Sequence, residues 1–369
     1  MTLYDPIERN LSRDKGTDQS EPFVVVQDLV KHYPVPGFPR GRSVKSVDGV
    51  SFTIKEGEIL GLVGESGCGK STIARVLMRL TPATSGVARV DARNVLAMKG
   101  EELRRMRRTM QLVFQDPFAA LDPRMKIGES MEVPLAQHGI GHARERRDLV
   151  LRMLSDVGLD ASFYDRYPKQ CSGGQLQRVV IGRALLLKPW FLVCDEPTSA
   201  LDASMRTQIL NLLTDLKRRF SLTMLMISHD LRVMRYMCDR IAVMYLGQIV
   251  EIADRDELFE NPRHPYTRAL IASSMLEESG LNSSAGLLKG EAPSPLHPPS
   301  GCRFHTRCIY AREACSHNVQ EFIQASQDHH VRCQFWDQLE EGATAASSAD
   351  GAGLEAPPAL RPQAAHVAA

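Results

Sequence analysis

Eight consecutive residues near position 70 have the types and spacing needed to hold a phosphate group. They read Gly-Glu-Ser-Gly-Cys-Gly-Lys-Ser from Gly64 to Ser71 and match the pattern G-x-x-x-x-G-K-[ST]. The glycines allow a tight turn whose backbone N–H groups point at phosphate oxygens, at the positive end of the following helix dipole. Lys70 is predicted to reach the terminal phosphates of a nucleotide, and Ser71 to place its hydroxyl on Mg²⁺. The predicted nucleotide contacts of this loop are Gly64, Ser66, Gly67, Cys68, Gly69, Lys70, Ser71 and Thr72.

Two adjacent carboxylates, Asp195 and Glu196, follow the apolar run 190–194. A strand that ends beside the phosphate loop would allow Asp195 to bind Mg²⁺ through the metal's water shell. Glu196, one residue further on, would orient and polarise an attacking water. Alone, such a run more often marks a strand that meets solvent, and the upstream phosphate loop is what favours the catalytic interpretation. The pair therefore predicts hydrolysis of a nucleotide.

A second anion-binding element precedes the helix-like run 176–185. A serine at a helix start followed by two glycines presents backbone N–H groups to an anion. Because the phosphate loop already holds a nucleotide of its own, this element is predicted to contact a nucleotide held by another subunit. Its residues are Ser172, Gly173, Gly174 and Gln175.

Alternating apolar strands and helices must position these groups. Buried strands of four to eight residues separated by amphipathic helices are typical of a mostly parallel sheet with covered faces. The predicted strands are 23–30, 58–63, 190–194 and 222–227, the predicted helices are 71–80 and 205–220, and 116–170 is rich in helix formers.

The bulk composition limits the class of protein. The chain has 369 residues, 43% of them hydrophobic, which supports a substantial core. Its 45 Lys and Arg against 44 Asp and Glu provide no large cationic field, so a nucleic-acid partner is not expected. The polar N-terminus and the absence of about 18 consecutive apolar residues predict neither export nor a membrane span.

The sequence resembles the nucleotide-binding domain of ABC ATPases, because Ser172-Gly-Gly-Gln175 matches the signature motif of that family. Cys171 replaces the leucine usual before that serine, at a packing position where little loss of function is expected. The resemblance implies ATP and Mg²⁺ as ligands. It also implies the α/β fold of a P-loop NTPase, with a RecA-like core, an N-terminal antiparallel β subdomain, an α-helical signature subdomain and a small C-terminal Cys-rich extension.

The resemblance also implies roles for residues outside these motifs. Gln115 matches the Q-loop glutamine, which in that family contacts Mg²⁺ and the attacking water. His229 matches the switch histidine, which senses the γ-phosphate. Asp202 matches the D-loop. Tyr33 fits the aromatic residue that stacks on adenine, with the alternative that it caps its strand. The implied catalytic residues are Glu196, His229 and Gln115, and the implied magnesium ligands are Ser71, Gln115 and Asp195.

The C-terminal third narrows the class of ABC ATPase. Residues 257–270 are similar to a segment typical of ATPase subunits of bacterial dipeptide and oligopeptide importers, including nickel-transporting relatives, and 116–123 points the same way. This implies a peripheral ATPase on the cytoplasmic face of the inner membrane. It would pair with a second, related ATPase subunit and serve two permeases, together with an extracytoplasmic solute-binding protein.

Two alternatives are kept. One is a soluble ABC ATPase acting on ribosomes or nucleic acid, which the single phosphate loop and the lack of heptads disfavour. The other is an exporter subunit, which would leave the importer-like C-terminal segment unexplained.

The sequence also predicts how the chain is divided. The predicted parts of the chain are a disordered N-terminus (1–21), a nucleotide-binding domain (22–260) with a helical subdomain at about 116–180, a helix and Pro-rich linker (261–300), a four-cysteine extension (301–336) and a disordered tail (341–369).

Four of the eight cysteines lie in this extension, with gaps of five, six and seventeen residues. Short C-x₂₋₄-C knuckles of structural zinc are absent from it, whereas four thiolates with looser spacing can hold an iron–sulfur cluster. Zinc, and free or disulfide-bonded cysteines, are the alternatives. In the family that the sequence resembles, this extension is associated with a [4Fe–4S] cluster. The implied ligands are Cys302, Cys308, Cys315 and Cys333.

Overall fold

The structure, a computed structural model, describes residues 22–35, 42–279 and 290–339. The predicted disordered ends, 1–21 and 341–369, lie outside the described residues, as does part of the predicted linker. The described residues up to Asp337 belong to one structural unit. No helix in the described part of the chain is both long and apolar enough to cross a bilayer.

The larger of two sheets carries the strands that end at the phosphate loop and at the two carboxylates. Over the described residues it has eight strands in the order β11-β12-β10-β9-β3-β8-β7-β6. Neighbours from β9 to β6 run parallel, and the pairs from β9 to β11 are antiparallel. Its strands are β3 (Ile59–Val63), β6 (Met110–Val113), β7 (Phe191–Asp195), β8 (Thr223–Ser228), β9 (Arg240–Tyr245), β10 (Gln248–Asp254), β11 (Ile323–Ser326) and β12 (His329–Val331).

The central strands β3, β7 and β8 are buried at every position. Along β7, Leu192 and Cys194 enter the hydrophobic cluster formed with α5 and α6, whereas Phe191 and Val193 enter the cluster formed with α1 and the smaller sheet. This alternation means that both faces of the sheet are covered, as parallel strands require. The predicted parallel sheet is confirmed, and strands β7 and β8 begin and end one residue later than predicted.

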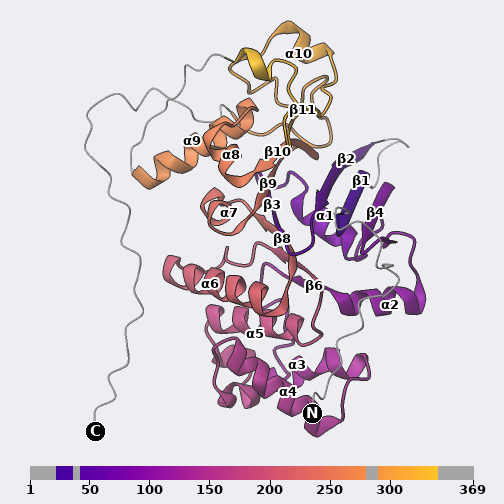
Figure 1. Ribbon diagram of the computed structural model, residues 1–369, viewed down its shortest axis with the longest axis vertical. Helices are drawn as coiled ribbons and strands as arrows, with labels where there is room; N and C mark the ends of the chain where they lie inside the picture. The colour runs from indigo at the N-terminus through magenta and orange to yellow at the C-terminus, as the bar shows by residue number, and fades with distance from the viewer. Residues whose placement is uncertain (1–21, 36–41, 280–289, 340–369) are drawn as a thin grey trace. The chain divides into compact units, whose positions relative to one another are not determined.

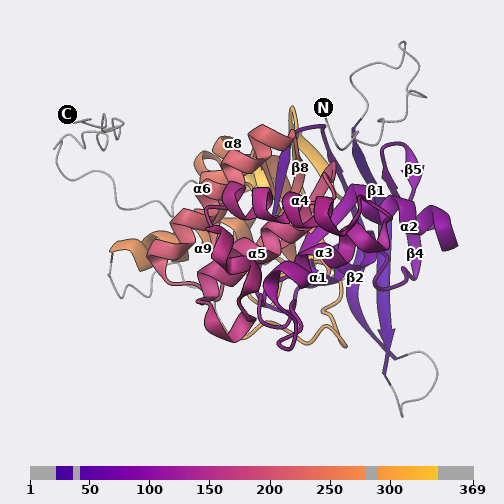
Figure 2. The same ribbon diagram turned by 90° about the horizontal axis from the view of Figure 1, so that it is seen from below.

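The smaller sheet is antiparallel, with the order β2-β1-β4-β5. Figure 2 shows β1, β2 and β4 gathered on one side and α5, α6 and α9 on the other. Helix α1 (Lys70–Leu77) buries Ile73, Ala74 and Leu77 in the cluster shared by the two sheets. The expected antiparallel β subdomain is therefore present. Its strands are β1 (Val24–Pro34), β2 (Ser43–Ile54), β4 (Ser85–Val90) and β5 (Arg93–Asn94).

Helices fill the interval between β6 and β7, and Figure 1 shows α3, α4 and α5 packed together. Four apolar positions in this interval have a spacing that predicts an amphipathic helix. Met153, Leu154 and Val157 are buried, and Leu149 is partly buried. The segments here are α3 (Ile127–Gln137), α4 (Ala143–Asp156), the 3₁₀ turns η1 (Ala161–Asp165) and η2 (Pro168–Gln170), and α5 (Gly173–Leu185). The other helices are α2 (Gly100–Thr109), α6 (Ala203–Phe220), α7 (Leu231–Met237), α8 (Arg255–Glu260), α9 (Pro265–Ser279), α10 (Glu313–His317) and η3 (Trp336–Gln338).

The four-cysteine segment joins the main sheet. Strand β12 pairs with β10, where Glu251 lies opposite Val331, and β11 pairs with β12. The backbone N–H of Arg332 donates to the carbonyl of Val250 at 2.7 Å. In Figure 1 the hairpin continues the sheet beyond β10. The segment is therefore built onto the sheet that also carries the phosphate loop.

Candidate active site

The loop between β3 and α1 is packed closely against neighbouring backbone. Gly69, at the N-cap of α1, has φ +112°, and an added Cβ would lie 2.0 Å from the carbonyl oxygen of Ser46. An added Cβ at Gly64 would lie 2.1 Å from the carbonyl oxygen of Met244. Glycine is required at both places, because any side chain would displace a strand. The loop backbone therefore follows a path that only glycine allows at these two positions.

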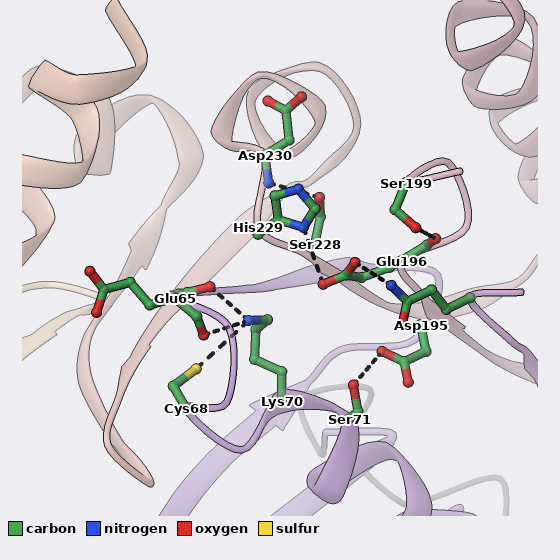
Figure 3. Close-up of polar contacts among 12 residues, drawn as sticks. Glu65, Cys68, Lys70, Ser71, Asp195, Glu196, Ser199, Ser228, His229 and Asp230 are labelled. Atoms are coloured by element: carbon green, nitrogen blue, oxygen red, sulfur yellow. Dashed lines mark hydrogen bonds and ion pairs between the residues drawn. The ribbon is translucent and has the colours of Figure 1, made fainter. Parts of the chain in front are cut away.

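The ammonium group of Lys70 lies over this loop. Its Nζ donates to the carbonyl oxygens of Gly64 at 2.6 Å and Glu65 at 3.0 Å, and it lies 3.8 Å from Cys68 Sγ (Figure 3). Burial raises the pKa of the Cys68 thiol, which favours its neutral form. The loop thus holds one positive charge in the position where a phosphate chain would need it.

Ser71 and Asp195, two of the three predicted magnesium ligands, are brought together from different elements. Ser71 Oγ donates to Asp195 Oδ1 at 2.9 Å. Burial raises the pKa of Asp195, and a nearby cation would offset that effect by favouring the ionised carboxylate. A hydroxyl and a carboxylate oxygen on the edge of a phosphate site are ligands that Mg²⁺ prefers, so the pair fits the ion.

The carboxylate of Glu196 is held between the other two predicted catalytic side chains. Gln115 Nε2 donates to Glu196 Oε2 at 3.0 Å, and His229 Nδ1 lies 3.2 Å from Oε1. Figure 3 shows His229 and Glu196 turned toward each other, above Ser71 and Asp195. The backbone of Glu196 is left-handed, with φ +49°, which is uncommon for a residue other than glycine and often occurs at functional sites.

The phosphate loop and the three predicted catalytic residues surround one pocket of about 550 Å³. Ser46, which was not among the predicted site residues, also lines the pocket, and its Oγ lies 2.8 Å from Thr72 Oγ1. Ser46 comes from β2 and belongs to no recognisable motif, so no signal in the sequence marks it. The lining residues are Ser46, Ser66, Gly67, Gly69, Lys70, Ser71, Thr72, Gln115, Glu196 and His229.

The predicted signature residues lie outside this pocket and cap α5 instead. Ser172 Oγ accepts the backbone N–H of Gln175 at 3.3 Å, and Gln175 Oε1 accepts that of Ser172 at 2.9 Å. This reciprocal capping box fixes the turn that Gly173 and Gly174 open. In the structure these residues therefore cap a helix and do not line this chain's own pocket.

Asp202 and Tyr33 also lie outside the pocket lining. Asp202 caps α6, where its Oδ1 accepts the backbone N–H of Met205 at 2.9 Å, and this bond lowers the pKa of Asp202. Tyr33 lies in β1 opposite Val44, with Lys31 Nζ 4.7 Å from its ring centroid. The structure thus gives Asp202 a local role and leaves the adenine contact of Tyr33 a prediction.

The four cysteines of the extension gather in one region without forming a compact ligand set. Across the described residues, no group of three or more His, Cys, Asp or Glu side chains is arranged to hold a metal ion. The thiols nevertheless interact: burial, followed by the charges of the other three, raises the pKa of Cys308 to about 12. The backbone N–H of Cys302 donates to the carbonyl of Cys315 at 2.7 Å. Burial likewise raises the pKa of Cys333 to about 11.

Comparison with known proteins matches two family models. One is described as ABC transporter and covers residues 47–199, and the other is described as oligopeptide/dipeptide transporter, C-terminal region, and covers 250–315. The chain is 44% identical to the oligopeptide transport ATP-binding protein AppF of Bacillus subtilis over 86% of this chain and 98% of that protein. It is 43% identical to the di/tripeptide transport ATP-binding protein DppF of Pseudomonas aeruginosa over 86% and 99%.

Solved structures show the same architecture. A dimeric ATP-binding cassette in a post-hydrolysis state with ADP and phosphate has a TM-score of 0.57 and 31% identity, over 63% of this chain and 98% of that one. CbiO1 of Clostridium perfringens, part of an ABC transporter complex, has a TM-score of 0.58 at 22% identity, over 71% and 96%, and supports the fold alone.

Proposed function

The chain belongs to the ABC transporter family, and we propose that it is the ATP-hydrolysing subunit of an importer for dipeptides, oligopeptides or a related small solute. The main support for ATP hydrolysis is the position of the Glu196 carboxylate. It lies between Gln115 and His229, in the pocket that also contains Lys70. A carboxylate held in this way can accept a proton from a water that attacks the terminal phosphate.

Each pocket residue has a distinct part in hydrolysis. Lys70 and the loop N–H groups bind the phosphates, and Ser71 with Asp195 would hold Mg²⁺, which neutralises developing charge on the phosphates when bound. Gln115 and His229 orient the Glu196 carboxylate from its two sides. Catalysis here is mostly positioning and electrostatic stabilisation, as is usual for phosphoryl transfer.

The second half of each site would come from another ATPase subunit. Ser172 and its two glycines form a capped helix start outside this chain's pocket, suited to meet a phosphate bound by a partner. The partner would offer its own such turn to the pocket described here. The solved cassette of similar fold, which is dimeric, supports this arrangement. We propose that the partner is a related, different subunit.

The remaining partners follow from the importer assignment. Two membrane permeases would receive the motion of the ATPase pair near Gln115, and an extracytoplasmic binding protein would deliver the solute. The subunit would then work from the cytoplasmic face of the inner membrane. The near-zero net charge of +1 gives no electrostatic support to the alternative of a nucleic-acid partner.

The substitution Glu196→Gln tests the catalytic assignment. It keeps the shape of the side chain and the contact with Gln115 but removes the proton acceptor, so hydrolysis should slow by about 10²- to 10⁴-fold. Nucleotide affinity should be retained, and solute uptake by the reconstituted transporter should stop. Glu101→Gln, an exposed carboxylate of α2, is the matched control. Unchanged hydrolysis by the Glu196 variant would show that the base has been assigned wrongly.

We further propose that Cys302, Cys308, Cys315 and Cys333 hold a [4Fe–4S] cluster. A set of four cysteine side chains is of the kind that holds such a cluster, whose chemistry would be structural or redox-sensing. An ultraviolet–visible spectrum of anaerobically purified protein, with iron and sulfide analysis, tests this proposal. A colourless protein with stoichiometric zinc would remove it, and Cys171→Ser is the control for thiol loss outside the extension.

A further inference from the structure

The side chain of Glu65, the second residue of the phosphate loop, is turned away from the pocket. Its backbone carbonyl accepts Lys70 Nζ at 3.0 Å, while its carboxylate is bound by Arg307. Arg307 Nη1 donates to Oε2 at 2.8 Å and Nη2 donates to Oε1 at 3.0 Å. Figure 3 shows the Glu65 carboxylate pointing away from Lys70. One residue thus connects the phosphate-binding lysine to the four-cysteine extension.

The backbone of Glu65 is held from the same side. Its N–H donates to Tyr266 Oη at 3.0 Å. Tyr266 has none of its surface exposed, and its ring centroid lies 4.7 Å from that of Tyr245 and 5.4 Å from that of Phe304. Arg307 Nη1 also donates to Tyr245 Oη at 3.4 Å. Both polar groups that Glu65 presents to the rear of the loop are therefore fixed by C-terminal side chains in an aromatic cluster.

These contacts are stronger than those of a surface ion pair. The Arg307 side chain is 6% exposed and that of Glu65 is 26% exposed, so water screens the pair only partly. Two parallel N–H···O bonds also fix the orientation of both groups. A loop with glycine at positions 64, 67 and 69 has many conformations to lose when it closes on a phosphate chain. Holding Glu65 beforehand reduces that loss.

A second arginine of the same turn contacts β2, the strand that carries the pocket residue Ser46. Arg303 donates to the carboxylate of Asp48 in β2 and to the carbonyl of Leu246. Asp48 lies two residues after Ser46, which lines the pocket, and its N–H donates to the carbonyl of Gly247 at 2.9 Å. The turn from 303 to 307 therefore contacts both the phosphate loop and the strand beside it.

We propose that Arg307 of the extension and Tyr266 of α9 are positioning residues of the phosphate loop, through which the C-terminal region sets the affinity of the pocket for nucleotide. The inference rests on the proposed ATPase function. It assigns to the extension a part in the ATPase cycle that does not depend on what the four cysteines bind. Neither residue lines the pocket, and both act through Glu65.

The substitution Arg307→Gln in the full-length chain tests this inference. Binding of a non-hydrolysable MgATP analogue should weaken about 5- to 30-fold, within the range of coupling between linked sites. The KM for ATP should rise by a similar factor while kcat at saturating ATP changes little, because the catalytic groups are untouched. Arg307→Lys should restore part of the affinity. Arg312→Gln, an exposed arginine of the same extension that lies over Phe335, should leave affinity unchanged.

Two further variants separate positioning from a general loss of fold. Tyr266→Phe keeps the ring packing and removes only the hydroxyl, and should weaken binding about 2- to 10-fold. Because Arg307 acts through Glu65, the double variant with Glu65→Gln should bind no more weakly than Arg307→Gln alone. Amide exchange at Glu65 in the nucleotide-free chain should accelerate in Tyr266→Phe and not in Arg312→Gln.

The outcomes distinguish this inference from the proposed function. If Arg307→Gln and Tyr266→Phe bind nucleotide like the unaltered chain while Lys70→Ala does not, the inference is wrong and the ATPase assignment stands. Equal affinity loss with Arg312→Gln would also overturn it, since the effect would then belong to the extension as a whole. Unchanged nucleotide binding by Lys70→Ala would instead overturn the proposed function.

Discussion

Two pairs of histidine and glutamate side chains lie in different parts of this molecule and are built differently. In the pocket, His229 Nδ1 lies 3.2 Å from Glu196 Oε1, and the histidine side chain is 58% exposed. Where the extension pairs with β10, His329 Nε2 lies 2.8 Å from Glu251 Oε1, with 1% and 0% of the side chains exposed. The same two residue types therefore meet once in contact with solvent and once in a dry interior.

The surroundings explain what each pair can do. Glu251 also accepts the backbone N–H groups of Arg263 at 2.6 Å and His264 at 3.0 Å, so its oxygens hold three elements of the C-terminal region together. Glu196 sits on a left-handed backbone at an open pocket, where its partners can be exchanged for water and phosphate. A buried pair with all its hydrogen bonds made therefore stabilises the fold, whereas a pair on a strained and accessible backbone is suited to catalysis.

The largest effect is expected from breaking the buried pair. Glu251→Ala leaves the His329 ring and two backbone N–H groups without their acceptor in a dry interior, and should lower the free energy of unfolding by about 3–5 kcal/mol. Denaturant unfolding of the full-length chain measures this loss. Glu257→Ala, which removes the longer 3.4 Å contact with His329 and weak contacts with Asn261 and Arg263, should cost much less. Equal stability of the two variants would contradict the structural role of Glu251.

The accessible pair should respond in the opposite way. His229→Ala removes one of the two groups that orient Glu196, and should slow hydrolysis about 100-fold, or about 2.7 kcal/mol in the barrier. The free energy of unfolding should stay within about 0.5 kcal/mol, since the side chain is mostly exposed. Turnover and denaturant unfolding of the same preparation provide both readouts, with the exposed His142→Ala as the control. A large stability loss without a rate effect would reverse the assignment of roles.

The features that could be predicted from the sequence are those that depend on residues close together in the chain. The phosphate loop and the Asp195–Glu196 pair were predictable because their chemistry demands fixed residue types at short spacing. The parallel sheet was predictable because buried strands alternate with helices. The contact of Glu65 with Arg307 joins residues 242 positions apart and follows no spacing rule.

Ser46 and the hairpin of β11 and β12 could not be predicted, because they too depend on contacts that no local sequence pattern marks, and the capping bond of Asp202 was not predicted either. Ser46 lines the pocket only because β2 packs beside α1, which no local pattern reveals. The hairpin of β11 and β12 was not predicted, because its strands are only four and three residues long and partly exposed. Asp202 was assigned a role in the D-loop by resemblance, and its helix-capping bond emerged from the structure.

The dry interior should also make stability depend on pH. Burial lowers the pKa of His264 from its ordinary 6.5 to about 3. Below pH 6.5 the unfolded chain binds a proton that the folded chain excludes, so this contribution to stability is present above pH 6.5 and declines as the pH falls toward 3. The expected slope is about 1.4 kcal/mol per pH unit.

Unfolding measured at several pH values from 7 to 5 tests this expectation. His264→Asn, which can still accept the backbone N–H of Tyr266, should flatten the slope, whereas the exposed His142→Asn should not. Identical pH profiles for the His264 variant and the unaltered chain would mean that the ring is solvated in the folded state, and the interior would not be dry.

The smallest effect is expected at Asp202, where a structural and a catalytic role can be separated. Asp202→Ala removes the acceptor for the backbone N–H of Met205 and should lower the free energy of unfolding by about 1 kcal/mol. Asp202→Ser keeps a cap and should restore most of that stability. If capping is the whole role, Asp202→Ser should also restore turnover. If the carboxylate acts across a subunit interface, turnover should stay low although the helix is capped, because serine carries no charge to offer the partner.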